Sequence, residues 1–317
     1  MVSLEARLGW ARAAMTISNA ATEQAQDGTS RRQSGEGATP SRGAGLADRQ
    51  ILLVLPAVLL LLIAFIWPVG YLLSRAFTQP RAGFQNFVEL WEQPGYLQVL
   101  WNTVLISAAA TPICVLLGFP VAHAMTYGSP RTKRWLIFIV LIPFWTSLLV
   151  RTFATVILLQ RNGPLNAMLI GFGLTNEPLP LLYNMTGLLT GAIQVLLPFV
   201  IFPLHAAMLR IDPAYMQAAL TLGAGPIRAF IRVYLPLTLP GLLTGATLVF
   251  ISTLGYYVTP AMLGGPRQTM IAQLIQDQIA QFGNWGVAGA LSLLLLAVSG
   301  VLLLLLHLTV GLKVTAR

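Results

Sequence analysis

Long apolar segments recur along this chain, and each is long enough to cross a lipid bilayer. About 20 consecutive apolar residues span the roughly 30 Å of hydrocarbon in a membrane. Inside that layer every backbone N–H and C=O must be bonded within the protein, so each segment is expected to be a helix. The sequence therefore predicts an all-α, polytopic membrane protein with six transmembrane helices. The predicted spans cover approximately residues 51–76, 99–125, 135–159, 184–209, 237–258 and 285–311.

The composition excludes a soluble domain. Hydrophobic residues make up 56% of the 317 positions and charged residues only 9%, whereas soluble domains carry about 25% charged residues. The one cysteine, Cys114, lies in an apolar segment, so neither a disulfide framework nor a thiolate metal site is expected within one chain. The net charge of +9 is spread over several loops. We therefore expect contact with anionic membrane lipids and no nucleic-acid binding.

Lysine and arginine are distributed unequally between the two sides of the predicted spans. Fourteen fall in the two termini and in the loops 126–134 and 210–236, against four on the opposite side. Without the distant N-terminal residues the ratio is still eight to four. Because positively charged loops stay in the cytoplasm, the sequence predicts that both termini are cytoplasmic.

Residues 1–49 precede the first apolar segment and are rich in Ala, Gly, Ser, Thr, Gln and Arg. Such a segment cannot bury enough apolar surface to offset the entropy lost on folding. We predict a disordered cytoplasmic tail over 1–49, followed by a transmembrane domain over 50–317.

The loop at about 210–236 carries two helix start signals. Asp212-Pro213 places an N-cap residue before a proline at the first helical position, and Gly225-Pro226 repeats the proline signal. Gly223 is expected to interrupt the first helix, which is predicted over 213–222.

The second helix of this loop is predicted to be short, cationic and amphipathic. Arg228 and Arg232 are four residues apart and share one face, while Ile227, Phe230 and Ile231 point elsewhere. Together the two helices are predicted to form a bent hairpin at the membrane surface.

This loop resembles the cytoplasmic EAA loop of permeases of ATP-binding-cassette importers. The family pattern is Glu-Ala-Ala, three residues, Gly, and, further on, Ile/Val-x-Leu-Pro. Gln217 stands where the family usually has glutamate, which removes a negative charge but keeps a hydrogen-bonding amide. The residues that the resemblance assigns to ATPase coupling are Gln217, Ala218, Ala219, Gly223, Ala224, Pro226, Leu235 and Pro236.

Other segments look like the PotB-type permeases of spermidine/putrescine importers. They extend over about residues 50–315 and include Trp101-Asn102-Thr103, 143–147, Val150-Arg151-Thr152, 257–266, 274–278 and Asn284-Trp285. The resemblance implies a permease with the type I importer fold that moves a polyamine across a bacterial inner membrane by alternating access. Such a protein is not an enzyme and needs no cofactor.

The resemblance also implies partners. They are an ATPase subunit dimer, a second PotC-like permease and a periplasmic solute-binding protein. The chain has no Gly-x-x-x-x-Gly-Lys-Ser/Thr phosphate loop of its own, so another subunit must hydrolyse ATP.

The sequence gives less information about which residues contact the solute. A polyamine is expected to need carboxylates and aromatic faces for its ammonium groups, yet none of the ten acidic residues lies in a predicted span. Either the partner permease supplies the acids, or the external binding protein selects the solute, or the solute is another small cationic or zwitterionic compound. The candidate pathway residues are Trp145, Arg151, Tyr256, Tyr257 and Asp277.

Arg151 lies within the predicted third span, where a charge is costly and often functional. A cation facing a cationic solute would repel it, so we favour a structural role in which the guanidinium reaches a headgroup or a helix carbonyl.

Two other classes of protein were weighed. An ion-coupled secondary transporter usually needs titratable groups near the middle of the membrane. An intramembrane enzyme needs a nucleophile paired with a base. The predicted spans contain neither arrangement.

Overall fold

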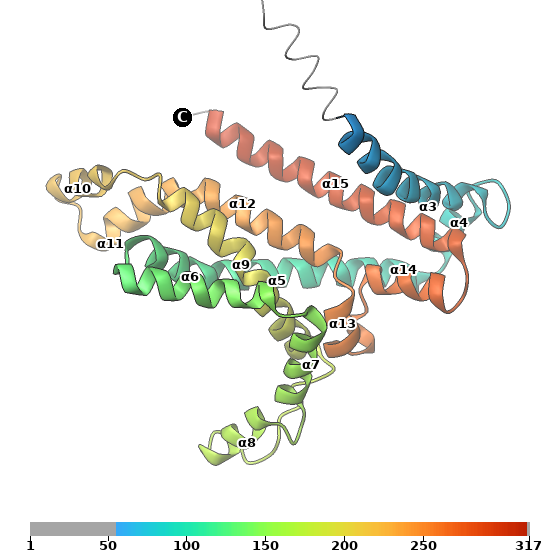
Figure 1. Cartoon of the computed structure of the whole chain (residues 1–317), viewed down its shortest axis with the longest axis horizontal. Helices are drawn as coiled ribbons and strands as arrows, with labels where there is room; N and C mark the ends of the chain where they lie inside the picture. Colours follow the sequence, from blue (N-terminus) through green and yellow to red (C-terminus); the bar gives the residue numbers. More distant parts are fainter. Residues whose placement is uncertain (1–54, 316–317) are drawn as a thin grey trace, which may run out of the picture. The chain divides into compact units, whose positions relative to one another are not determined.

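The computed structural model describes residues 55–315, which are almost entirely helical (Figure 1). Within these residues, five helices are long and apolar enough to cross a membrane, or six if one bent pair counts as a single span. This agrees with the predicted all-α fold with six spans. The tail predicted over 1–49 lies outside the described residues.

The chain divides into two units, 1–68 and 69–317. The first unit holds the start of the helix Leu55–Thr78, which includes the π-helical turn η1 (Leu62–Ile66). The helical elements of the first part of the second unit are α3 (Trp67–Thr78, which starts in the first unit), α4 (Gln85–Glu92), α5 (Pro94–Tyr127), α6 (Pro130–Trp145), α7 (Leu148–Leu159) and α8 (Pro164–Gly171). Those that follow are α9 (Met185–Met208), α10 (Pro213–Thr221), α11 (Pro226–Ala229), η2 (Phe230–Tyr234), α12 (Leu235–Leu254), α13 (Val258–Leu263), η3 (Pro266–Gln268), α14 (Ile271–Ala280) and α15 (Trp285–Thr315).

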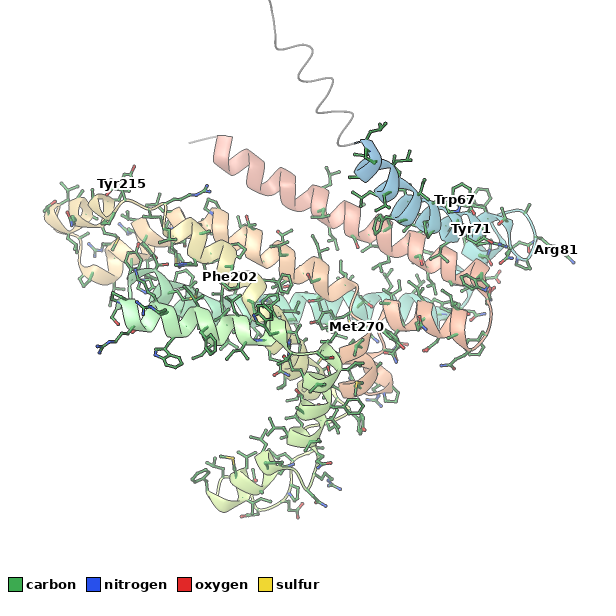
Figure 2. The ribbon with its side chains drawn as sticks, viewed as in Figure 1. Trp67, Tyr71, Arg81, Phe202, Tyr215 and Met270 are labelled. Carbon is green, nitrogen blue, oxygen red and sulfur yellow. The ribbon has the colours of Figure 1, made fainter. Side chains whose placement is uncertain are left out.

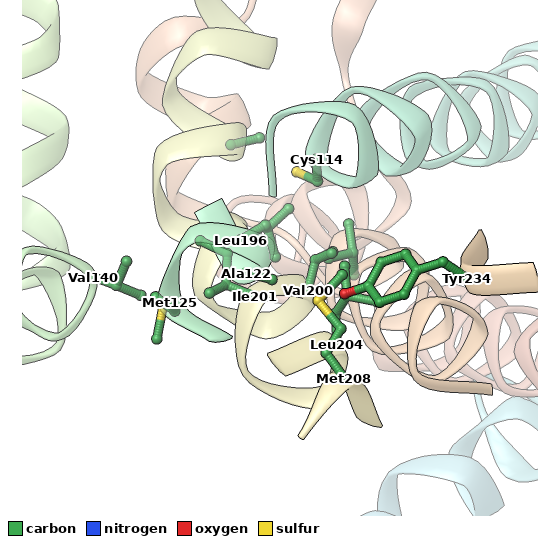
Figure 3. Close-up of a cluster of buried hydrophobic side chains, with 12 residues drawn as sticks. Cys114, Ala122, Met125, Val140, Leu196, Val200, Ile201, Leu204, Met208 and Tyr234 are labelled. Carbon is green, nitrogen blue, oxygen red and sulfur yellow. The ribbon is translucent and has the colours of Figure 1, made fainter. Parts of the chain in front are cut away.

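The main core of the second unit lies where α5, α9 and α12 pack on one another. Figure 3 shows this core as a cluster of buried side chains, to which α9 contributes Leu196, Val200, Ile201 and Leu204. Because lipid tails are as apolar as these side chains, close packing rather than water exclusion holds such helices together.

A second core joins α4, α14 and α15. The Asn86 side chain of α4 is 2% exposed and donates hydrogen bonds to the carbonyls of Ala76 at 2.8 Å and Gln79 at 2.6 Å. These bonds satisfy carbonyls freed where α3 ends, as buried backbone groups require. The apolar residues of this core include Leu90, Ile271, Val287, Ala290 and Leu291.

The span predicted over 135–159 is not one continuous helix. The structure has two helices there, α6 and α7, and the helix that starts at α7 is bent by 102° from α6. Thr146 and Ser147 are both extended at the break. Thr146 Oγ1 donates to the Pro143 carbonyl at 3.1 Å, so a side chain satisfies a group that the ended helix leaves free. Figure 1 shows α7 and α8 leading away from α6.

The fifth span also differs from its predicted limits. A separate short helix was predicted after Gly225, and the span itself over 237–258. Instead α11, η2 and α12 form one helix, Pro226–Leu254, of 29 residues. Tyr256 and Tyr257 therefore lie beyond the end of this helix, between α12 and α13.

Candidate functional site

The candidate coupling site is the hairpin made by α10 and the start of the helix Pro226–Leu254. Its first arm begins as predicted, because Asp212 Oδ1 accepts the Ala214 N–H at 2.8 Å and Pro213 occupies the first helical position. This bond satisfies one of the N–H groups that have no partner within the helix.

The first arm ends in a Schellman motif. The Gly223 N–H donates to the Leu220 carbonyl and the Ala224 N–H to the Ala219 carbonyl, both at 3.0 Å. Gly223 has a φ of +86°, the left-handed conformation that such an end requires and that glycine adopts without strain. The spacing from the second alanine to Gly223 and Ala224 thus has a physical basis: it sets the residue at which α10 stops.

Most of α10 is uncovered in this chain, and none of its residues is buried. Met216 packs against the main core, while Gln217 and Ala218 are exposed and Ala219 is half-buried. Large apolar side chains are exposed as well, including Tyr215, which Figure 2 labels at the outer end of the hairpin. The exposed apolar residues of this arm are Tyr215 at 57%, Leu220 at 47% and Leu222 at 87%.

The second arm starts at Gly225 and Pro226 as predicted, and then becomes part of a membrane-spanning helix. A π-helical turn, η2, makes this possible. The Leu235 N–H donates to the Phe230 carbonyl five residues back. Pro236 has no N–H to offer and its ring would crowd the carbonyl four residues before it, so the wider turn accommodates the Leu235-Pro236 pair without ending the helix.

Aromatic side chains of this second arm pack against α5. The Tyr234 ring centroid lies 5.6 Å from that of His123 and 5.9 Å from that of Tyr127. Phe230 stacks on Tyr234 at 5.4 Å and meets Phe119 edge-on at 6.0 Å. Figure 3 shows Tyr234 directed into the main core. The second arm therefore contacts α5 and is continuous with α12.

Of the candidate pathway residues, Arg151 has a defined structural contact. Its Nη2 donates to Thr146 Oγ1 at 2.9 Å and to the Thr146 carbonyl at 3.1 Å. The guanidinium thus bridges the break between α6 and α7, which is the structural role favoured from the sequence. Trp145, at the end of α6, is 89% exposed.

The other candidate pathway residues occupy different surroundings. The Tyr256 ring packs against the main core, and its hydroxyl is buried without a hydrogen-bond partner among the described residues. Tyr257 is 41% exposed at the start of α13. Asp277 lies on α14, where its carboxylate accepts from Gln281 Nε2 at 3.1 Å. Asp277 is therefore engaged within its own helix.

Sequence reasoning missed two features of this region. One is the π-helical turn, for which the signal was present in Pro236, a proline inside what proved to be a continuous helix. The other is the bond from Arg151 to Thr146, which depends on the unforeseen break after Trp145.

The comparisons with known proteins agree on one family. Residues 97–312 match the family described as binding-protein-dependent transport system inner membrane component. The chain is 34% identical, over 76% of its length and 82% of the relative's, to the spermidine/putrescine transport system permease protein PotB of Haemophilus influenzae. It is 31% identical to PotB of Escherichia coli strain K12, over 69% of this chain and 79% of that one.

A solved structure shows the same fold. The chain aligns with a chain of a bacterial alginate ABC transporter, solved in complex with an alginate pentasaccharide-bound periplasmic protein, with a TM-score of 0.65 and 22% identity. The alignment covers 84% of this chain and 96% of that chain. At this identity the likeness concerns the fold, which is that of an importer permease.

Proposed function

Since this chain belongs to the family of binding-protein-dependent transport system inner membrane components, we propose that it carries a polyamine as the permease subunit of an ATP-binding-cassette importer. The proposal of a polyamine as the substrate rests on the 34% identity to PotB of Haemophilus influenzae over 82% of that protein. Family membership also argues against the ion-coupled carrier and the intramembrane enzyme considered above.

The exposed face of α10 supports docking of an ATPase subunit. Tyr215, Leu220 and Leu222 are large apolar side chains that this chain leaves exposed, as is the polar Gln217, and exposed apolar surface among polar residues is typical of a protein contact. In this proposal both termini and the hairpin are cytoplasmic, as the distribution of Lys and Arg favours.

The hairpin supports a mechanism for coupling. Closure of the ATPase dimer would displace α10 as a rigid body. Because η2 is continuous with the 29-residue helix Pro226–Leu254 and its rings contact α5, that displacement would tilt two spans together. Tilting of packed helices around a fixed site is the general form of alternating access.

We expect the solute to contact another subunit as well as this chain. Arg151 is engaged by Thr146 and none of the ten acidic residues lies in a predicted span, so within the membrane this chain offers a polyamine aromatic surface such as Trp145 and Tyr257 rather than carboxylates. We infer that a second, PotC-like permease completes the route and that a periplasmic binding protein supplies selectivity. Another small cationic or zwitterionic solute would use the same route, and is the alternative to a polyamine.

Transport by the reconstituted importer tests this function. Proteoliposomes that contain this chain, its second permease and the ATPase, with the binding protein added outside, should accumulate labelled putrescine or spermidine when ATP is enclosed inside, on the ATPase face. Omission of the ATPase subunit should abolish accumulation. Uptake that persists without the ATPase contradicts the importer assignment, whereas ATP-dependent uptake of a different solute contradicts the polyamine alone.

A thiol cross-link tests the docking of α10 separately. Ala218→Cys places an exposed thiol on α10, and the natural Cys114 is buried, so it is protected from the reagent. The variant should cross-link to a cysteine in the ATPase groove in at least one nucleotide state. Leu248→Cys, exposed on α12 within the span, is the control that should not react with the ATPase.

A further inference from the structure

A surface groove lies along the second arm of the hairpin. It has a volume of about 580 Å³. The residues that line it are Gly225, Pro226, Ile227, Arg228, Ile231 and Arg232. It thus combines two guanidinium groups with two apolar side chains, and its lining contains no carboxylate.

The length of the fifth span indicates that the groove lies at the depth of the lipid headgroups. The helix Pro226–Leu254 has 29 residues, and roughly 20 are enough to cross the hydrocarbon. The remaining residues, about nine, extend the helix by roughly 13 Å at 1.5 Å per residue. Both arginines are at the N-terminal end, whereas the opposite end, 241–254, is apolar and uncharged. The extension therefore belongs to the end that carries Arg228 and Arg232.

The isoleucines of the groove are exposed in a way that suits a lipid. Ile227 is 75% exposed and Ile231 55%. Beside a bilayer, such side chains contact the glycerol backbone and the upper acyl chains, while arginine side chains at the same level extend toward the headgroups. A surface that alternates cations and apolar groups matches the chemistry of an anionic phospholipid.

We propose that this groove binds an anionic phospholipid such as phosphatidylglycerol. Arg228 and Arg232 hold its phosphate, for which guanidinium groups offer paired hydrogen bonds, and Ile227 and Ile231 contact its acyl chains. The positive end of the helix dipole adds to the attraction for phosphate. The proposal concerns these side chains and the end of the span, and it does not depend on the solute that the importer carries.

The lipid would act on the hairpin that we assign to coupling. The groove spans the start of the second arm and η2, and η2 contacts α10. A lipid bound there would restrain the N-terminal end of the fifth span. This is the end that contacts α10 and would be displaced with it. The ATPase is the competing occupant of the groove. We favour the lipid because the exposed apolar residues of α10 offer the ATPase a separate surface.

The experiment uses the assembled importer in nanodiscs of phosphatidylcholine, with and without phosphatidylglycerol. Native mass spectrometry counts the phosphatidylglycerol molecules that remain bound after transfer to detergent, and titration gives their affinity. The wild type should retain the anionic lipid. The double variant Arg228→Gln/Arg232→Gln should bind it roughly tenfold more weakly or worse, because each basic side chain near an anionic surface contributes about fivefold.

Two further variants make the result specific. Arg131→Gln/Arg134→Gln removes the same charge from exposed positions at the start of α6, and should leave the retained lipid unchanged. Ile227→Ser/Ile231→Ser keeps both charges and should still weaken binding of phosphatidylglycerol. If the arginine double variant fails to assemble, Arg228→Lys/Arg232→Lys replaces it, and should bind the lipid with intermediate affinity since lysine lacks the paired donors.

Four outcomes overturn the proposal. The first is no preference of the wild type for phosphatidylglycerol over phosphatidylcholine. The second is equal loss of lipid in the α6 control, which indicates general attraction to the surface. The third is displacement of the lipid by soluble inorganic phosphate, which identifies a site for a free anion. The fourth is a groove variant that retains the lipid but no longer holds the ATPase, which assigns the groove to that subunit.

Discussion

Gly245 of α12 lies directly against the backbone of Val200 of α9. A methyl group placed at Gly245 would come within 2.9 Å of Val200 Cα and 3.2 Å of its carbonyl oxygen. Gly241, one turn earlier, faces α9 in the same way, so the two form the Gly-x-x-x-Gly spacing that lets membrane helices approach closely. The contact between the fifth span and α9 is therefore fixed by backbone rather than by adaptable side chains.

We predict that Gly245→Ala destabilises the protein by about 1–3 kcal/mol, the usual cost of forcing an extra carbon into a packed contact. The midpoint of thermal unfolding in detergent measures this loss. Gly300→Ala in α15 is the matched control, because a methyl group there meets nothing within 4 Å. That control should be neutral or stabilising, since alanine favours a helix over glycine. Equal effects of the two substitutions would contradict the close contact.

We predict that Arg151→Met lowers stability by about 1–2 kcal/mol, because it removes charge-assisted hydrogen bonds to Thr146. Thr146→Val removes the bonds made by Oγ1, including its own bond to the Pro143 carbonyl, and keeps the bond from Arg151 to the Thr146 carbonyl. The two changes should be less than additive in a double-mutant cycle, by about 0.5–1 kcal/mol. The apparent KM for the solute should stay unchanged in the importer that carries Arg151→Met. A raised KM with unaltered unfolding would instead assign Arg151 to the solute.

The sequence did not predict the break between α6 and α7 that Arg151 bridges. Hydropathy reports that 135–159 is apolar on average and carries no information on the direction of the chain. A pair of helices at 102° and one straight helix therefore look the same. The ends of α10 were predictable, because Asp212, Pro213 and Gly223 each act on the backbone next to them. The contact at the break instead joins Thr146 to Arg151, five residues away, and forms only once the helix has ended.

The prolines of this chain do not by themselves predict where its helices end. Pro236 directly precedes the span predicted over 237–258, yet the helix runs through it because a π-helical turn ends just before it. The turn η1 ends two residues before Pro68 in the same manner, with the Trp67 N–H bonded to the Leu62 carbonyl. Whether a proline ends a helix or follows a widened turn is therefore not evident from the proline alone.

We predict that Pro236→Ala allows the π-helical turn to relax to a regular α-helix. Alanine restores an N–H donor and removes the ring that crowds the carbonyl four residues earlier. Loss of the extra residue from the turn would rotate α10 by about 100° around the axis of the fifth span. Because this rotation would misplace the surface of α10 that we assign to the ATPase, ATP-driven transport should fall several-fold. A structure of the variant with η2 intact, or full transport, would contradict this account.

We predict that Gln217→Glu changes ATP-driven transport by less than about twofold. Gln217 is exposed on α10, and an exposed ion pair at a contact contributes little, about 0–1 kcal/mol. The measurement is solute-stimulated ATP hydrolysis by the reconstituted importer, with Gln217→Ala as the companion variant that also removes the amide. A large gain with glutamate would show that charge, rather than the shape of α10, limits coupling.

We predict that Gly223→Ala uncouples ATP hydrolysis from transport, whereas Gly225→Ala does not. A methyl group at either position meets nothing within 4 Å, so neither change produces a steric clash. The difference lies in the backbone. Gly223 has a φ of +86° and Gly225 a φ of −66°, and the left-handed conformation costs a residue with a Cβ about 1–2 kcal/mol.

That strain falls on the Schellman motif that ends α10, so Gly223→Ala should favour hairpins in which α10 has moved relative to η2. Basal hydrolysis should persist, while the part stimulated by the loaded binding protein falls several-fold. Gly223→Asn should retain more coupling than Gly223→Val, because asparagine tolerates the left-handed conformation and a β-branched residue does not. If alanine, asparagine and valine at this position were equally harmful, side-chain bulk at the ATPase contact would be the cause rather than backbone conformation.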